Sequence, residues 1–298
     1  MFPRRRYILF QLTLILALGL SACASATGTP ATPTPAVPSA TPLPPTPTPP
    51  PLAAIVNDEW LTEEEFLAEV ERYRAAQAAL GNEIATDDAV PVVLDDLIAQ
   101  ILLAQAARAE GFELTEADLG SRMDALISDV GGADALTAWQ SEHGYTDESF
   151  QSALKRAAEA AWMRDKIIET VPGTAEQVHA QQILLYNEDA ARKVADQLNA
   201  GTKFADLAVL YDPNTGGELG WFPRGYLLEP ALEETAFSLE PGQISDVIES
   251  GVGYHILLVV ERDSQHQLSP DAYLVMQEKA LVDWLAQKRA ESDIVLAP

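Results

Sequence analysis

Half of the residues between Pro30 and Pro51 are proline, and this run constrains the chain more than any other feature. It holds 11 prolines in 22 residues and no charged side chain. Proline has no backbone N–H and a fixed φ, so such a run favours extended polyproline II over helix or sheet. At about 3.1 Å per residue it would reach roughly 70 Å, as a stiff stalk or a passive spacer. The working part of the chain must therefore lie beyond it, from Leu52.

The segment before the proline run has the three parts of an export signal. Arginines at positions 4–6 precede an apolar run from Ile8 to Leu20, and small residues then end at Cys23. The run is shorter than the roughly 20 residues of a membrane span. Residues 20–23, Leu-Ser-Ala-Cys, resemble the bacterial lipoprotein signal, in which the cysteine is lipidated; a plain secretory signal is the alternative. We predict a signal peptide over residues 1–22 and a lipid-anchored linker over 23–51.

Composition excludes several classes of protein. The chain has 45 acidic against 19 basic residues, a net charge of −26, and this field repels nucleic acid. Cys23 is the only cysteine, so the chain has neither an internal disulfide nor a catalytic cysteine. With 298 residues and 47% hydrophobic content, it can form one large or two medium domains with true cores.

Residues 52–173 predict a helical domain, because apolar side chains recur there near helical spacing between capping residues and glycines. None of these helices carries a recognisable catalytic set. We predict helices that open at Thr62, Pro91, Thr115 and Thr146, with breaks at Gly111, Gly131-Gly132 and Pro172-Gly173.

The periodicity changes after Gly173. Alternating segments such as VHAQQILLY and GYHILLVVE predict strands, and capped segments such as NEDAARKVADQLNAG predict helices. The expected order is β-α-α-β-α-β-β over about 90 residues. A single sheet with helices packed on it is an α+β domain.

The stretch GGELGWFPRG, residues 216–225, restricts the backbone strongly. Gly216 and Gly217 allow a tight turn into the sheet, and Gly220 is expected to leave room for a close neighbour. Trp221 and Phe222 should point to opposite faces of a strand, so one of them should be core.

Three motifs in order, GGELGWFPRG, ETAFSLEPGQIS and GYHILLV, resemble parvulin-type peptidyl-prolyl cis-trans isomerases over residues 174–263. Glu218 stands where that family has aspartate. The flanking helices resemble the chaperone domain of SurA-type chaperones and PrsA-type lipoprotein foldases. This implies a parvulin domain inserted in an all-helical lobe, with a C-terminal segment, residues 264–298, packing back on the N-terminal helices. The side chains expected to do so are Tyr273, Leu281, Trp284 and Leu285.

The resemblance also implies the site residues. Parvulins use two histidines, a Cys or Asp, a Met and a Phe. His255 matches the second histidine and Asp212 the Cys/Asp position, whereas Gln182 stands where the first histidine is expected. Leu227 or Leu228 takes the Met position and Leu232 the Phe position, and Trp221 and Phe222 complete the candidate substrate contacts. His179 lies three residues before Gln182, so alternation points it to the other face.

Rotation about an X-Pro amide breaks no bond, so the predicted activity needs no nucleophile, metal or cofactor. Two hypotheses remain. Asp212 and His255 favour a membrane-anchored isomerase that acts on exported polypeptides. Gln182 and Leu232 favour a chaperone whose parvulin domain only binds peptides.

Overall fold

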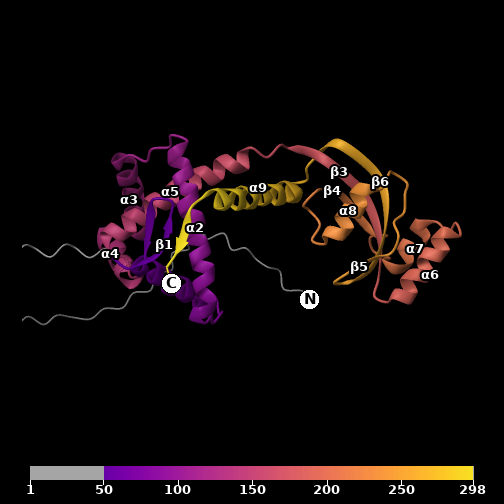
Figure 1. Cartoon of the computed structure of the whole chain (residues 1–298), viewed down its shortest axis with the longest axis horizontal. Coiled ribbons are helices and arrows are strands. Elements are labelled where there is room, and N and C mark those ends of the chain that lie inside the picture. Colours follow the sequence, from indigo (N-terminus) through magenta and orange to yellow (C-terminus); the bar gives the residue numbers. More distant parts are fainter. Residues whose placement is uncertain (1–49, 298) are drawn as a thin grey trace, which may run out of the picture.

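A computed structural model describes residues 50–297, which form a lobe and a smaller α+β domain connected by extended strands and one long helix (Figure 1). The predicted signal peptide, Cys23 and most of the proline run lie outside the described residues. The lobe contains β1 (Leu52–Val56), β2 (Glu59–Thr62), α1 (Glu63–Ala79), α2 (Thr86–Ala109), α3 (Glu116–Val130), α4 (Ala133–Glu142), α5 (Asp147–Glu169), α9 (Pro270–Glu291) and β7 (Ile294–Leu296).

Local sequence signals set most helix ends of the lobe. Thr62 accepts the N–H of Glu65 at the start of α1, and a reciprocal capping box joins Thr115 to Asp118 at the start of α3. Gly131 ends α3 in the left-handed conformation. These ends agree with the prediction.

The predicted start of the second helix at Pro91 is wrong, because α2 begins at Thr86 and carries Pro91 inside it. Asp87 and Asp88 lie in the first turn, where carboxylates interact favourably with the helix dipole. The proline still leaves one turn without an N–H donor, and packing of α2 in the core offsets that loss. Helix α4 was not predicted at all.

The lobe also contains a three-stranded sheet of order β2-β1-β7, which the all-helical prediction missed. Strand β7 comes from the C-terminal end and pairs with β1, so that Ala54 lies opposite Leu296. Three to five residues are too few to show a strand period, and pairing between distant segments leaves no local signal.

Helix α2 is the centre of the lobe and packs against α1, α5, α9 and β1. Leu281, Trp284 and Leu285 of α9 pack on the cluster formed by α2 and α5, and the hydroxyl of Tyr273 donates to the carbonyl of Val171. In the described part of the chain, α2 is the one helix long and apolar enough to cross a membrane; 56% of its most apolar stretch is buried, as in a core helix.

The smaller domain has the predicted order β-α-α-β-α-β-β, and its α+β class is confirmed. Its elements are β3 (Thr174–Leu185), α6 (Glu188–Asn199), α7 (Phe204–Tyr211), β4 (Glu218–Pro223), α8 (Pro230–Ser238), β5 (Ile248–Ser250) and β6 (Gly253–Gln267). The antiparallel sheet has the order β4-β3-β6-β5. Ile183, Leu185 and Ile256 face α6 and α7 on one side, and Val178, Ala180 and Leu257 face α8 on the other.

Strands β3 and β6 lead out of the lobe and back into it. Thr174 lies opposite Gln267, and the N–H of Leu268 donates to the carbonyl of Gly173 at 2.9 Å. The smaller domain therefore begins and ends at neighbouring points.

Candidate functional site

Gln182 and His255 come together on the face of the sheet that α8 covers. They lie on neighbouring strands, with Gln182 opposite Leu257 and Leu184 opposite His255, so the two side chains are diagonal neighbours. The side-chain oxygen of Gln182 lies 3.0 Å from Nδ1 of His255. The two positions that the sequence proposed as a catalytic pair are therefore in hydrogen-bond contact.

His255 is also held at its second nitrogen. The hydroxyl of Ser250, on β5, lies 2.8 Å from Nε2 and accepts the N–H of Val252. With the Gln182 oxygen facing Nδ1, the proton sits on Nδ1 and Nε2 is an acceptor. The single Ser250 hydroxyl proton has two acceptors within reach, Nε2 at 2.8 Å and the Gly253 carbonyl at 3.2 Å, and Nε2 is the nearer. Ser250 was not predicted, and only the pairing of β5 with β6 brings it here.

The His255 side chain is buried, with 3% of the residue exposed. Burial lowers the pKa of His255, and the nearby Glu229 carboxylate opposes that effect in part. A neutral imidazole with both nitrogens in hydrogen bonds is thus the resting form of the site.

Apolar side chains line the same face of the sheet. Phe222 and Leu232 belong to the cluster of β3, β4, β6 and α8 and are 0% and 6% exposed, and Leu227 packs against that cluster. Leu228, in contrast, is 98% exposed. Of the two candidates for the Met position, Leu227 is therefore part of the apolar wall, and Leu228 points into solvent.

Asp212 lies in the loop between α7 and β4, where its carboxylate accepts N–H groups of Asn214 and Thr215 and the Thr215 hydroxyl. These bonds, the Thr215 hydroxyl first, lower the pKa of the Asp212 carboxyl. The carboxylate is thus charged and engaged in its own loop. It has no hydrogen bond to His255 among the described contacts.

The same loop returns to the sheet at Gly217. The Gly217 carbonyl accepts the N–H of Gln182 at 2.7 Å. A Cβ added to Gly217 would lie 2.0 Å from the Gln182 carbonyl oxygen. The close neighbour expected at Gly220 is therefore at Gly217 instead. Gly220 has open space around it and is required for its φ of +74°.

Comparison with known proteins identifies this part of the chain. The family model of the PPIC-type PPIase domain, Rotamase, matches residues 167–261. These residues belong to the parvulin-type peptidyl-prolyl cis-trans isomerases. The match thus covers nearly all of the α+β domain that holds Gln182 and His255, from the end of α5 to most of β6.

Relatives extend the similarity beyond the parvulin domain. The foldase protein PrsA of Halalkalibacterium halodurans is 28% identical over 79% of this chain and 79% of the relative. A chaperone SurA from Nitrosospira multiformis is 36% identical over 33% of this chain and 25% of the relative. A crystal structure of the peptidylprolyl isomerase PrsA from Bacillus cereus matches at 22% identity over 77% of this chain and 81% of that one, with a TM-score of 0.42.

Trp221 and Phe222 point to opposite faces of the parvulin sheet, as predicted, and the structure shows that Phe222, 0% exposed, is the core residue of the two. Trp221 stacks between the rings of His179 and His266, with centroids 5.4 and 3.9 Å away. His179 also contacts the Glu218 carboxylate at 2.5 Å. Trp221 and His179 therefore lie across the sheet from His255.

Within residues 50–297, no cluster of three or more His, Cys, Asp or Glu could hold a metal.

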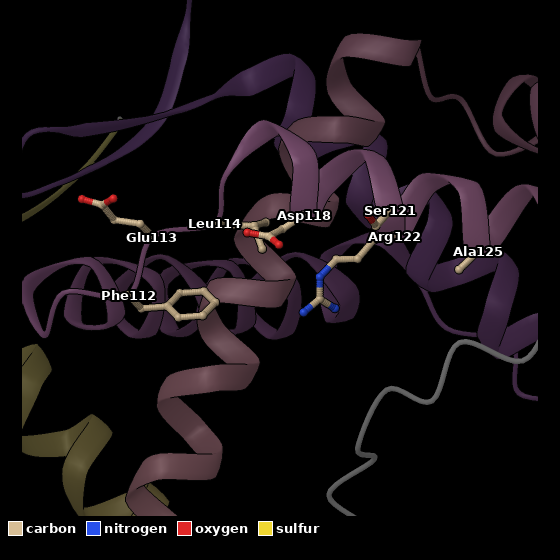
Figure 2. A pocket seen from close by; sticks show the side chains of 7 residues that line it. All are labelled: Phe112, Glu113, Leu114, Asp118, Ser121, Arg122 and Ala125. Atoms are coloured by element: carbon tan, nitrogen blue, oxygen red, sulfur yellow. The ribbon is translucent and has the colours of Figure 1, made fainter.

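A hollow of about 480 Å³ lies in the lobe rather than in the parvulin domain. Figure 2 shows side chains of the α2–α3 loop and of α3 around it, among them Phe112, Leu114 and Arg122. No residue of α3 is fully buried, although the helix has an apolar side. The lobe thus offers partly apolar surface away from the parvulin domain.

Proposed function

We propose that this chain is an extracytoplasmic, membrane-anchored foldase whose parvulin domain isomerises X-Pro bonds of exported polypeptides. The observation that carries the proposal is the chain of hydrogen bonds from Gln182 through His255 to Ser250 beside the apolar wall of Leu227 and Leu232. The relatives named as foldases and chaperones support clients that are unfolded, exported chains.

The reaction is rotation about an amide bond with a barrier of about 18–20 kcal/mol. An apolar surface can hold the proline ring, and a fixed polar group can stabilise the twisted amide as its resonance is lost. The hydrogen-bonded set of Gln182, His255 and Ser250 supplies these polar groups, and His255 at its centre fixes the positions of the other two side chains. Asp212, whose carboxylate is engaged in its own loop, takes no part in this set of hydrogen bonds.

A second function, a chaperone with a non-catalytic parvulin domain, is favoured by Gln182. Glutamine donates and accepts hydrogen bonds, but it cannot share a proton with His255 as a second histidine could. The hollow at Phe112 and the half-buried apolar side of α3 give such a chaperone a surface for unfolded chains.

One measurement separates the two functions. Exchange between the cis and trans forms of a short X-Pro peptide should be followed by NMR with residues 50–298, which contain every described element. The isomerase proposal expects faster exchange with the protein than without it, and a loss of that gain in His255→Ala. Exchange at the uncatalysed rate with folded protein supports the chaperone.

Membrane anchoring rests on Cys23 and its Leu-Ser-Ala-Cys box, which lie outside the described residues. We propose that the lipidated cysteine holds the protein at the membrane surface and that the proline run spaces the lobe from it.

A further inference from the structure

The loop between β4 and α8 carries Leu227 of the apolar wall, and a single carboxylate holds its backbone. Both oxygens of Glu233 accept the N–H of Gly225 at 2.7 Å. One of them also accepts the N–H groups of Tyr226, at 3.1 Å, and Leu227, at 3.3 Å. Three consecutive backbone donors therefore converge on one side chain.

Three successive N–H groups that point inward form a concave site for an anion. Here the protein fills that site with its own Glu233, in the first turn of α8, where the helix dipole also favours a negative charge. Bonds from N–H groups to a charged acceptor are stronger than bonds between neutral groups. The loop is thus fixed to α8 by more than its apolar contacts.

The neighbours of Glu233 connect this anchor to the site. Leu232, the preceding residue, is buried in the apolar cluster, and Leu227, whose N–H Glu233 accepts, packs against the same cluster. One turn of α8 therefore supplies both part of the wall and the group that sets the position of the rest.

The opposite side of the loop is closed by α9. A Cβ added to Gly225 would lie 2.7 Å from Cδ of Lys279, and Figure 1 shows α9 reaching from the lobe to this end of the domain. Gly225, with its φ of +87°, lies between the Glu233 carboxylate and the stem of Lys279. The loop has little freedom to shift without breaking one of these contacts.

The geometry points to Glu233 as a positioning residue for the isomerase site: its carboxylate holds residues 225–227 so that Leu227 faces the substrate. Glu233 touches no reacting atom in this scheme and acts through the loop. The inference deepens the proposed function and rests on it for the kinetic effect, whereas the effect on the loop backbone is independent of any activity.

The test uses residues 50–298 with Glu233→Gln and Glu233→Asp. Glutamine keeps the size of the side chain but replaces one acceptor oxygen with a donor, and aspartate keeps both oxygens on a side chain one methylene shorter. Glu234→Gln is the matched control. Glu234 is an exposed neighbour on the same helix, and its substitution removes the same charge. Amide hydrogen exchange of residues 225–227 and the kinetics of the X-Pro peptide are measured on each variant.

We expect Glu233→Gln to speed exchange of these three amides by about tenfold or more and to lower kcat/KM about tenfold, mainly through KM. Glu233→Asp should recover part of both effects, and Glu234→Gln should change neither. Unchanged amide exchange in a folded Glu233→Gln protein overturns the inference. Faster amide exchange with unchanged kcat/KM overturns it as well. If Glu233→Gln does not fold, Glu233→Asp against Glu234→Gln decides by the same criteria.

If the wild type has no isomerase activity, the proposed function fails and the affinity for the same peptide replaces kcat/KM. Weaker peptide binding together with faster amide exchange of residues 225–227 in Glu233→Gln then supports the positioning role. Equal affinity overturns it.

Discussion

The Nδ1 atom of His255 lies 3.0 Å from the side-chain oxygen of Gln182, across neighbouring strands of the parvulin sheet. With an amide at position 182, His255 has a hydrogen-bond partner but no second imidazole with which to share a proton. We therefore expect the residue at position 182 to change the rate of isomerisation but not the position of His255.

Gln182→His should raise kcat/KM on a short X-Pro peptide, and His255→Ala should lower it. One hydrogen bond in such a site is worth about 1–3 kcal/mol, or roughly one to two orders of magnitude in rate. NMR exchange of the peptide measures both changes. His179→Ala is the control, because His179 lies on the opposite face and should leave the rate unchanged. No gain from Gln182→His in a folded protein contradicts this prediction and indicates that the pocket differs elsewhere.

Protonation of His255 should lower the free energy of unfolding as the pH falls. Burial lowers its pKa in the folded state below the usual value of about 6.5, so the unfolded chain binds the proton first as the pH falls. The stabilisation is therefore complete above about pH 6.5 and is lost below it, down to the folded pKa. NMR titration of the His255 ring and urea unfolding between pH 7.5 and 5 test this. His255→Gln should flatten the pH dependence; a slope equal to that of the wild type contradicts the assignment.

Gly217→Ala should destabilise the parvulin domain by about 3 kcal/mol or more, because the added Cβ meets the Gln182 carbonyl at 2.0 Å and the φ is +77°. Gly220→Ala is the matched control, with a φ of +74° and open space, and should cost only about 1–2 kcal/mol. Urea unfolding of the two variants gives the difference. Equal losses would mean that the close contact at Gly217 has no energetic weight.

The lobe should bind unfolded chains without the parvulin domain. The hydrogen bond between Gly173 and Leu268 means that residues 174–267 can be replaced by a short glycine linker. The shortened protein should still suppress aggregation of a client with few prolines, measured by light scattering. A shortened lobe with native helix content by circular dichroism but no such effect contradicts the prediction.

Cys23→Ser should move the protein from the membrane fraction to the soluble or unprocessed pool, because the thiol is the predicted site of lipidation. Ser25→Ala, two residues away, is the control and should fractionate as the wild type does. Fractionation and gel mobility measure both. A Cys23→Ser protein with unchanged membrane content and mobility contradicts the anchor.

The sequence by itself determined the elements and their order in the parvulin domain, and most helix ends in the lobe. Thr115, Thr146 and Asn187 cap helices through side-chain bonds to residues three positions away, so short segments contain the whole signal. The three parvulin motifs likewise lie in continuous stretches, and the last of them contains His255; Gln182 was assigned from its place in the first strand, directly before Ile183 and Leu184.

Only the tertiary structure decided which residues meet. The register of β3 against β6 joins Gln182 to His255, the pairing of β5 brings Ser250, and the return of a loop places Gly217 against β3. The lobe sheet pairs β1 with β7 from the far end of the chain, and Pro91 lies inside a helix because burial of α2 outweighs its local cost. Local patterns fix backbone preferences within a few residues, whereas these contacts depend on burial and pairing between segments far apart in sequence, which no local pattern records.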